Sequence, residues 1–191
     1  DPRPIVGDNY ADKSERFYGN NDVDGPDSMH GTHVSGIIAA KSGNGIGMDG
    51  IAGNGYVKIM SVRTVPNGDE RDKDVANAIR YATDNGAKIL NMSFGKAYSP
   101  DKQIVWDAFK YAEKKGLLLI KAAGNENVNI DDEIHFPTVY DNKGAEVSKN
   151  VITVGANTMD NDNLRASFSN FGKKSVDVFA PGNEIYSTVP N

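Results

Sequence analysis

The sequence predicts an α/β protein with a mostly parallel sheet and helices on both faces. Three observations predict it: short apolar strands alternate with amphipathic helices, glycines stand where the helices should end, and polar glycine-bearing segments follow the strands. Apolar residues make up 38% and charged residues 25% of the 191 residues, which is typical of a globular protein. We expect one domain over residues 1–191, with a loop-rich segment at 1–29 and the core at 30–191.

The first part of the chain predicts a loop, a helix and a strand. Residues 1–29 are polar, rich in Gly, Asn and Asp, and show no periodicity, so we expect a loop there. A helix of small residues is expected over 30–40. A glycine-rich connection over 43–55 then leads to a strand over 58–65.

Two amphipathic helices are expected in the middle of the chain. The first covers 74–85, and Gly86 is placed to end it. The second has Ser99 as its N-cap and Pro100 in its first turn, and it ends at Gly116. Their apolar faces have the spacing of helical turns and consist of Val75, Ala78, Ile79 and Ala82 in the first, and Ile104, Val105, Ala108, Phe109 and Ala112 in the second.

A short buried strand is expected at 88–92 and an apolar strand at 117–122, followed by two later strands at 151–155 and 176–179. In an open parallel sheet, ligands bind beyond the carboxyl ends of the strands. Two polar segments, Asn91–Gly95 and Ala123–Asn125, each lie just past such an end. We therefore expect these segments to meet at one edge of the sheet.

The charge and residue usage exclude several classes of function. The net charge is −5 and there is no basic cluster, so nucleic acid is not expected as a partner. The chain has no cysteine, which excludes disulfides, thiol catalysis and Cys-based zinc sites. No apolar run approaches the ~18 residues of a membrane span.

A histidine and an asparagine carry the chemistry that the sequence indicates. His30 stands at the start of the small-residue helix, where a general base would have a fixed orientation. Asn125 follows Gly124 after a buried strand, so its amide can project into a cleft as an oxyanion donor. The alternative for each is structural: a histidine packed at a helix start, and a turn asparagine.

The segments around these residues resemble the subtilisin-like serine peptidases (subtilases). His-Gly-Thr-His-Val-Ser-Gly, Asn-Met-Ser-Phe-Gly and Ala-Ala-Gly-Asn match three motifs of that family in order, and later segments continue the match: His30–Gly36, Asn91–Gly95, Ala122–Asn125, Asn150–Ala156, Ser167–Gly172, Ala180–Gly182 and Ser187–Thr188. The resemblance covers about residues 28–190 and implies a subtilisin-like, three-layer α/β fold.

The resemblance also implies a reaction and the residues that serve it. The activity would be that of a serine endopeptidase, with His30 as general base and Asn125 as oxyanion donor. The substrate would bind against Ser93, Phe94, Gly95, Ala123 and Gly124. The resemblance makes Ser93 a residue of the substrate cleft and not the nucleophile; its alternative is a structural residue at a strand end. The Gly-x-Ser-x-Gly pattern of the α/β-hydrolases is absent. A cis peptide bond is expected between Phe136 and Pro137.

The aspartate and serine motifs of the family are not found. Asp8 lacks both the preceding apolar strand and the following glycine, and Gly-Thr-Ser-Met would come shortly after Pro190. We therefore expect the central part of a catalytic domain, truncated at both ends and inactive when isolated. The alternative is a non-catalytic subtilase-like module, a pseudoenzyme that binds peptides or partner proteins.

Metal-dependent chemistry is the weaker interpretation. His30 and His33, with Asp22, Asp24 and Asp27, would suit a metal-dependent hydrolase, but Gly31 stands where the metalloprotease signature needs a glutamate. We expect no catalytic metal and no required cofactor.

The sequence also bears on calcium binding and on the location of the protein. Asn20–Gly25 has the start of an EF-hand loop, yet the twelfth position holds Gly31 in place of the required glutamate. A looser structural calcium site stays open beside a solvated acidic loop. By resemblance alone, we expect peptide or protein substrates and an extracytoplasmic location (secreted, periplasmic or cell-surface).

Overall fold

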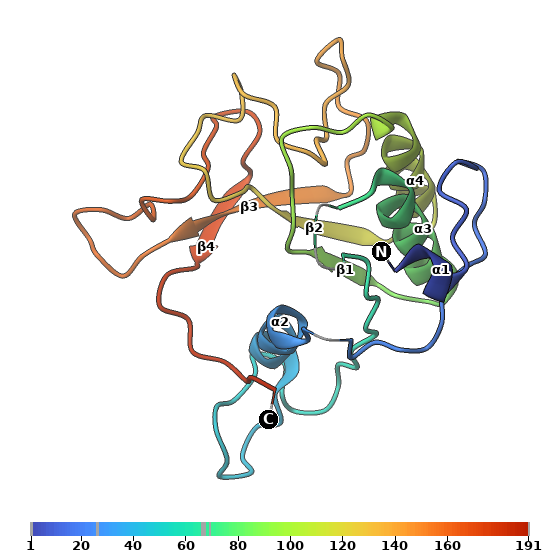
Figure 1. The fold of residues 1–191 in the computed structure, drawn as a ribbon. Coiled ribbons are helices and arrows are strands. Elements are labelled where there is room, and N and C mark those ends of the chain that lie inside the picture. Colours follow the sequence, from blue (N-terminus) through green and yellow to red (C-terminus); the bar gives the residue numbers. More distant parts are fainter. Residues whose placement is uncertain (1, 26, 66–67, 69, 191) are drawn as a thin grey trace.

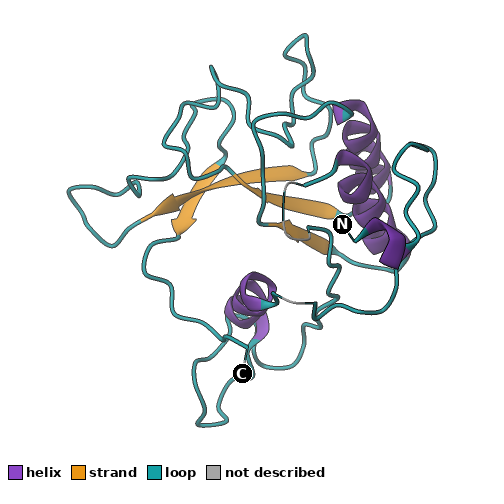
Figure 2. Ribbon diagram, viewed as in Figure 1, coloured by secondary structure: helices purple, strands orange, loops and turns teal. Residues whose placement is uncertain are grey.

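The centre of the protein is a four-stranded parallel sheet, seen in Figures 1 and 2 in a computed structural model that describes residues 2–25, 27–65, 68 and 70–190. The strands lie side by side in chain order: β1 (Ile89–Met92), β2 (Leu118–Ala122), β3 (Val151–Asn157) and β4 (Val178–Pro181). All neighbouring pairs are parallel. The four predicted strands are thus confirmed, with small shifts at their ends, but the predicted burial of the first is wrong, because only Met92 of β1 is buried.

Two helices, α3 (Asp72–Asp84) and α4 (Lys102–Lys114), pack against each other beside the sheet (Figure 1). Their apolar faces are those predicted, and Phe109 and Ala112 are completely buried. Gly86 and Gly116 follow the helices with φ of 85° and 77°, the left-handed conformation that ends a helix. The core that α3, α4 and the sheet share consists of Val75, Ala76, Ile79, Met92, Val105, Trp106, Ala108, Phe109, Ala112, Leu117, Leu119, Val139 and Val151.

The helix α2 (Met29–Ala39) lies on the other side of the sheet from α3 and α4 (Figure 1). It confirms the predicted small-residue helix. Residues 185–188, here called the strap, run along it: Ser187 Oγ donates to His33 O at 2.6 Å and Thr188 Oγ1 donates to Thr32 O at 2.9 Å. Gly36 is buried under the strap, where an added Cβ would lie 2.2 Å from Thr188 Oγ1.

Two predictions about local structure are wrong. Residues 58–65 form no strand among the described residues, and Ile59 and Met60 remain 45% and 42% exposed. Strand formation needs a neighbour to pair with, and alternation of side chains does not provide one. Ser99 is not the N-cap of α4, because Asp101 occupies that position and Ser99 Oγ donates instead to Asp72 Oδ1 at 2.7 Å.

The N-terminal segment is more ordered than the predicted loop. It contains the single-turn helix α1 (Arg3–Val6), which Gly7 ends with a φ of 73°. Lys73 on α3 anchors the segment, since its Nζ donates at 2.6 Å to Asp8 Oδ1 and to Glu15 Oε2. The side chains of Lys73 and Asp8 are each only 1% exposed. The terminal residues Asp1 and Asn191, on which the prediction of truncation falls, lie outside the described residues.

No helix within the described ranges is both long and apolar enough to cross a membrane.

Candidate functional site

The strand pairing brings the two predicted polar segments together at one edge of the sheet. β1 and β2 are parallel neighbours, with Met92 opposite Lys121. The segments Ser93–Gly95 and Ala123–Asn125 follow the last residues of these strands, Met92 and Ala122. Ala123 N still donates to Val154 O on β3 at 2.9 Å, so the second segment starts from a fixed position.

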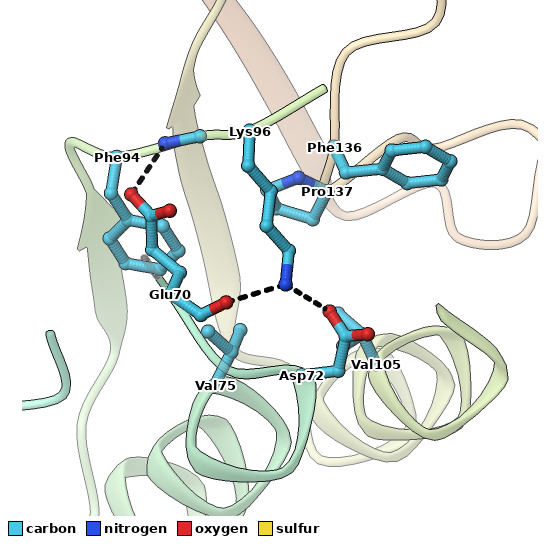
Figure 3. A pocket seen from close by; sticks show the side chains of 9 residues that line it. Glu70, Asp72, Val75, Phe94, Lys96, Val105, Phe136 and Pro137 are labelled. Atoms are coloured by element: carbon cyan, nitrogen blue, oxygen red, sulfur yellow. Dashed lines mark hydrogen bonds and ion pairs between the residues drawn. The ribbon is translucent and has the colours of Figure 1, made fainter. Parts of the chain in front are cut away.

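The segment after β1 is tied to the start of α3 by polar contacts (Figure 3). Gly95 N donates to Glu70 Oε1 at 3.2 Å, and Lys96 Nζ lies 2.8 Å from Asp72 Oδ1 and also donates to Glu70 O. Phe94 packs against the hydrophobic core. These residues border a small pocket lined by Glu70, Asp72, Val75, Phe94, Gly95, Lys96, Val105, Phe136 and Pro137.

The segment after β2 is organised by one buried side chain, Asn170. Its Oδ1 accepts from Glu126 N and Val128 N at 3.0 Å each. Its Nδ2 donates to Ala123 O at 3.0 Å and to Glu126 Oε2 at 2.6 Å. Asn170 is completely buried, whereas Asn125 is exposed within the loop so formed. The loop therefore presents the Asn125 amide to solvent from a rigid base.

The conformation of this loop requires glycine at position 124. Gly124 has a φ of 108°, which disfavours any residue with a side chain. The Asn125 N–H donates to Glu126 Oε2 at 3.0 Å. Glu126 Oε2 also accepts from Asn170 Nδ2, so the carboxylate links the Asn125 backbone to the buried Asn170 side chain.

His30 is exposed in the first turn of α2. Within the described part of the chain, no hydrogen bond joins its side chain to another residue, and none links it to Asn125. His33, one turn later, has a structural contact: its Nε2 lies 3.1 Å from Ile185 O in the strap. The structure thus brings Ser93–Gly95 and Ala123–Asn125 together. Among the described residues, the His30 side chain forms no hydrogen bond to either segment.

The third histidine, His135, was not singled out by the sequence analysis. Its ring lies over two of the predicted site residues, because a Cβ added at Gly95 or Gly124 would lie 2.1 Å or 2.9 Å from His135 Cε1. The peptide bond that follows one residue later, between Phe136 and Pro137, is cis, as predicted. In the sequence, only the Phe136-Pro137 pair pointed to this part of the site, and His135 immediately precedes that pair.

Two buried basic side chains near this edge, Lys121 and His135, have lowered pKa values. Burial lowers the pKa of Lys121 to about 8, and the Asp177 carboxylate opposes that effect. Burial also lowers the pKa of His135, against the opposing charge of Glu126, so the imidazole is neutral at pH 7. The interior beneath the two segments is therefore poorly solvated.

The acidic segment 20–25 uses its side chains to form turns. Asn20 Oδ1 accepts from Asp22 N at 3.0 Å, and Asp22 Oδ1 accepts from Gly25 N at 3.1 Å. Among the described residues, no three His, Asp or Glu side chains gather in an arrangement that would hold a metal ion.

The fold and these residues define an α/β protein whose candidate site lies at the carboxyl edge of a parallel sheet. The chain belongs to the subtilase family, whose family model matches residues 6–191. It is 40% identical over 183 residues to the cell wall-associated protease of Bacillus subtilis (strain 168), covering 95% of this chain and 18% of that protein. It is 34% identical over 189 residues to the major intracellular serine protease of the same organism, covering 98% and 54%.

A solved structure supports the fold assignment. The chain is similar to a cold adapted subtilisin-like serine proteinase with a TM-score of 0.65 and 30% identity, covering 84% of this chain and 51% of that one. The predicted subtilisin-like fold is thereby confirmed. The chain spans about half or less of the length of these relatives.

Proposed function

We propose that the protein carrying these 191 residues is a serine endopeptidase that hydrolyses peptide bonds in proteins. The observation that carries the proposal is the meeting of Ser93–Gly95 and Ala123–Asn125 at one sheet edge in a member of the subtilase family. The relatives named above are proteases, which supports the same reaction class. Both the substrate and the location are inferred from that membership.

The chemistry assigns a step to each candidate residue. A serine hydroxyl attacks the peptide carbonyl carbon, and a ring nitrogen of His30 accepts its proton. The oxyanion that forms accepts hydrogen bonds from the Asn125 amide and a backbone N–H. Collapse of the intermediate releases the amine, which takes the proton from His30, and water then hydrolyses the acyl-enzyme. The serine and the triad aspartate would lie outside these 191 residues, and the isolated chain would have no meaningful activity.

The substrate backbone would lie along Ser93–Gly95, opposite Ala123 and Gly124. Gly95 N–H, a donor that a bound peptide can use, is engaged by Glu70 Oε1 at 3.2 Å. A bound peptide that uses this donor must therefore displace the Glu70 carboxylate. We further propose an extracytoplasmic location and a reaction that requires no cofactor.

The test compares the full-length gene product with the isolated 191-residue chain. A fluorophosphonate labels activated serines, and mass spectrometry then maps the labelled peptide. We expect a label on a serine outside residues 1–191 in the full-length protein and no label on the isolated chain. A label on Ser93 would contradict the proposed site, and no label on either protein would favour a non-catalytic binding module.

Variants of the full-length protein test the two catalytic residues. His30→Ala should lower kcat by on the order of 10⁶-fold, and Asn125→Ala by on the order of 10²–10³-fold; both magnitudes are those known for subtilisin, adopted here because the family is the same. His33→Gln is the matched control, because the amide can still reach the Ile185 carbonyl. Substantial activity in His30→Ala would exclude His30 as the general base.

A further inference from the structure

The segment after β1 pairs with the protein backbone on one side only. Lys96 N donates to Phe136 O at 2.9 Å and Phe136 N donates to Lys96 O at 2.8 Å, which forms an antiparallel bridge. Successive residues of an extended segment direct their backbone groups to opposite sides, so those of Gly95 face away from Phe136. On that side, no backbone group among the described residues pairs with Gly95. The segment therefore has an open edge at Gly95, where an extended peptide can add as a further strand.

The Glu70 side chain occupies this open edge (Figure 3). Its Oε1 accepts a hydrogen bond from Gly95 N at 3.2 Å. The carboxylate oxygen thus takes the place of the carbonyl oxygen that a pairing peptide would offer to the same N–H. Within the described ranges, this is the only hydrogen bond of the Glu70 carboxylate, and its length is at the long end of the normal range. One weak bond therefore holds the side chain on the edge.

The backbone that carries the Glu70 side chain is held more firmly. Lys96 Nζ donates to Glu70 O and lies 2.8 Å from Asp72 Oδ1. The Asp72 side chain is only 3% exposed, and its Oδ1 also accepts from Ser99 Oγ at 2.7 Å. Because the main chain is anchored and the carboxylate is not, the Glu70 side chain can rotate away from Gly95 without a shift of α3.

We infer that the Glu70 carboxylate makes an autoinhibitory contact, in which it competes with the substrate backbone for Gly95 N–H. This inference rests on the proposed peptidase function. A peptide that pairs with the open edge must release the carboxylate, so breaking that hydrogen bond weakens its binding. A substrate too short to reach Gly95 leaves the contact intact. Glu70 therefore weakens the binding of long peptides selectively, and it covers the edge against unrelated strands when no substrate is bound.

The experiment measures kcat/KM of the full-length enzyme on two thiobenzyl esters that end in the same residue, an acetylated tetrapeptide and an acetylated single amino acid. The readout is the ratio of the long to the short substrate. Glu70→Ala should raise this ratio about 10-fold through a lower KM for the tetrapeptide, the effect of removing a competing hydrogen bond to a charged acceptor. Glu70→Asp keeps the charge but shortens the side chain by one methylene, so it should raise the ratio to a similar extent.

Glu133→Ala is the control for the loss of a negative charge, because Glu133 is exposed and its carboxylate forms no hydrogen bond to another described residue. Its ratio should equal that of the wild type. An unchanged or lower ratio in Glu70→Ala, an inactive Glu70→Ala, or a wild-type ratio in Glu70→Asp would overturn the inference alone. A wild-type enzyme that cleaves neither ester nor any protein would overturn the proposed function and this inference with it.

Discussion

At the scale of single residues, Lys73 shows how a charge is held in the interior. Its ammonium donates to two carboxylates, Asp8 and Glu15, and to the carbonyl of Asn9 at 2.8 Å. Burial alone would lower the pKa of Lys73, but these acceptors raise it above the ordinary value, so the lysine stays charged. The N-terminal segment is thus fastened to α3 by a charged network.

Replacement of Lys73 by methionine tests this network. The variant leaves the Asp8 carboxylate buried without its counter-ion, so we expect the free energy of unfolding to fall by about 3 kcal/mol. Urea unfolding followed by circular dichroism measures the change. Lys13→Met is the matched control, since the Lys13–Asp101 pair at 2.9 Å is about one-third exposed and should contribute no more than about 1 kcal/mol. Equal losses in the two variants would show that the buried network has no special role.

At the scale of elements, the loop after β2 depends on a residue more than 40 positions away. Asn170 makes four hydrogen bonds to this loop and cannot touch a substrate through its buried amide. It therefore acts as a positioning residue for Asn125. Its role is local order in the loop that carries the proposed oxyanion donor.

The Asn170→Ala variant of the full-length enzyme separates positioning from binding. We expect kcat to fall by on the order of 10²-fold while KM changes little, because the oxyanion donor loses its fixed position. Ser167→Ala is the control, since Ser167 lies in the same segment and is exposed. A variant that loses activity only through a higher KM would contradict the positioning role.

The buried Lys121 on β2 makes the free energy of unfolding depend on pH. The pKa of Lys121 is about 8 in the folded protein against an ordinary 10.5, so between these pH values the unfolded state binds more protons. The free energy of unfolding should therefore rise as pH increases through this window. At lower pH, where both states are protonated, the charge lowers stability by about 3 kcal/mol at most.

Lys121→Met should remove this dependence. We expect the variant to be more stable than the wild type at pH 7 and the difference to shrink toward pH 10, as followed by urea unfolding at each pH. Lys88→Met, which replaces a lysine just before β1, controls for the general loss of a positive charge. A difference that is constant with pH would mean that Lys121 titrates normally.

The elements differ in how far the sequence predicts them. The helices α3 and α4 were predicted because Val75, Ile79, Val105 and Phe109 repeat at helical spacing, and that pattern depends on local order alone. The strand expected at 58–65 is wrong because pairing depends on a distant neighbour. The contact of His135 with Gly95 and Gly124 was missed for the same reason, since it joins residues from three separate segments of the chain.

At the scale of the whole molecule, apolar side chains remain uncovered beside α2. Tyr56 is 91% exposed, and Val57, Ile59 and Met60 are between 42% and 45% exposed. Ile51, just before them, is 91% exposed. Exposed apolar side chains that lie close together in the sequence favour association.

We expect the isolated 191-residue chain to self-associate as its concentration rises, as measured by light scattering. The double variant Ile59→Lys, Met60→Lys should reduce the association, because it places charges within the apolar segment. Met159→Lys is the control, since Met159 is 90% exposed in a different loop. A wild-type chain that stays monomeric at high concentration would contradict the prediction.

The close approach of the strap to α2 has a consequence for how this sequence can change during evolution. Gly36 leaves no room for a methyl group, because Ser187 Oγ and Thr188 Oγ1 lie where it would be. These hydroxyls also bond the carbonyls of His33 and Thr32, one turn beyond His30. A larger residue at 36 therefore requires the side chains at 187 and 188 to move or to differ. Positions separated by about 150 residues are thus constrained to vary together. This constraint acts on α2, the helix that carries the proposed general base, His30.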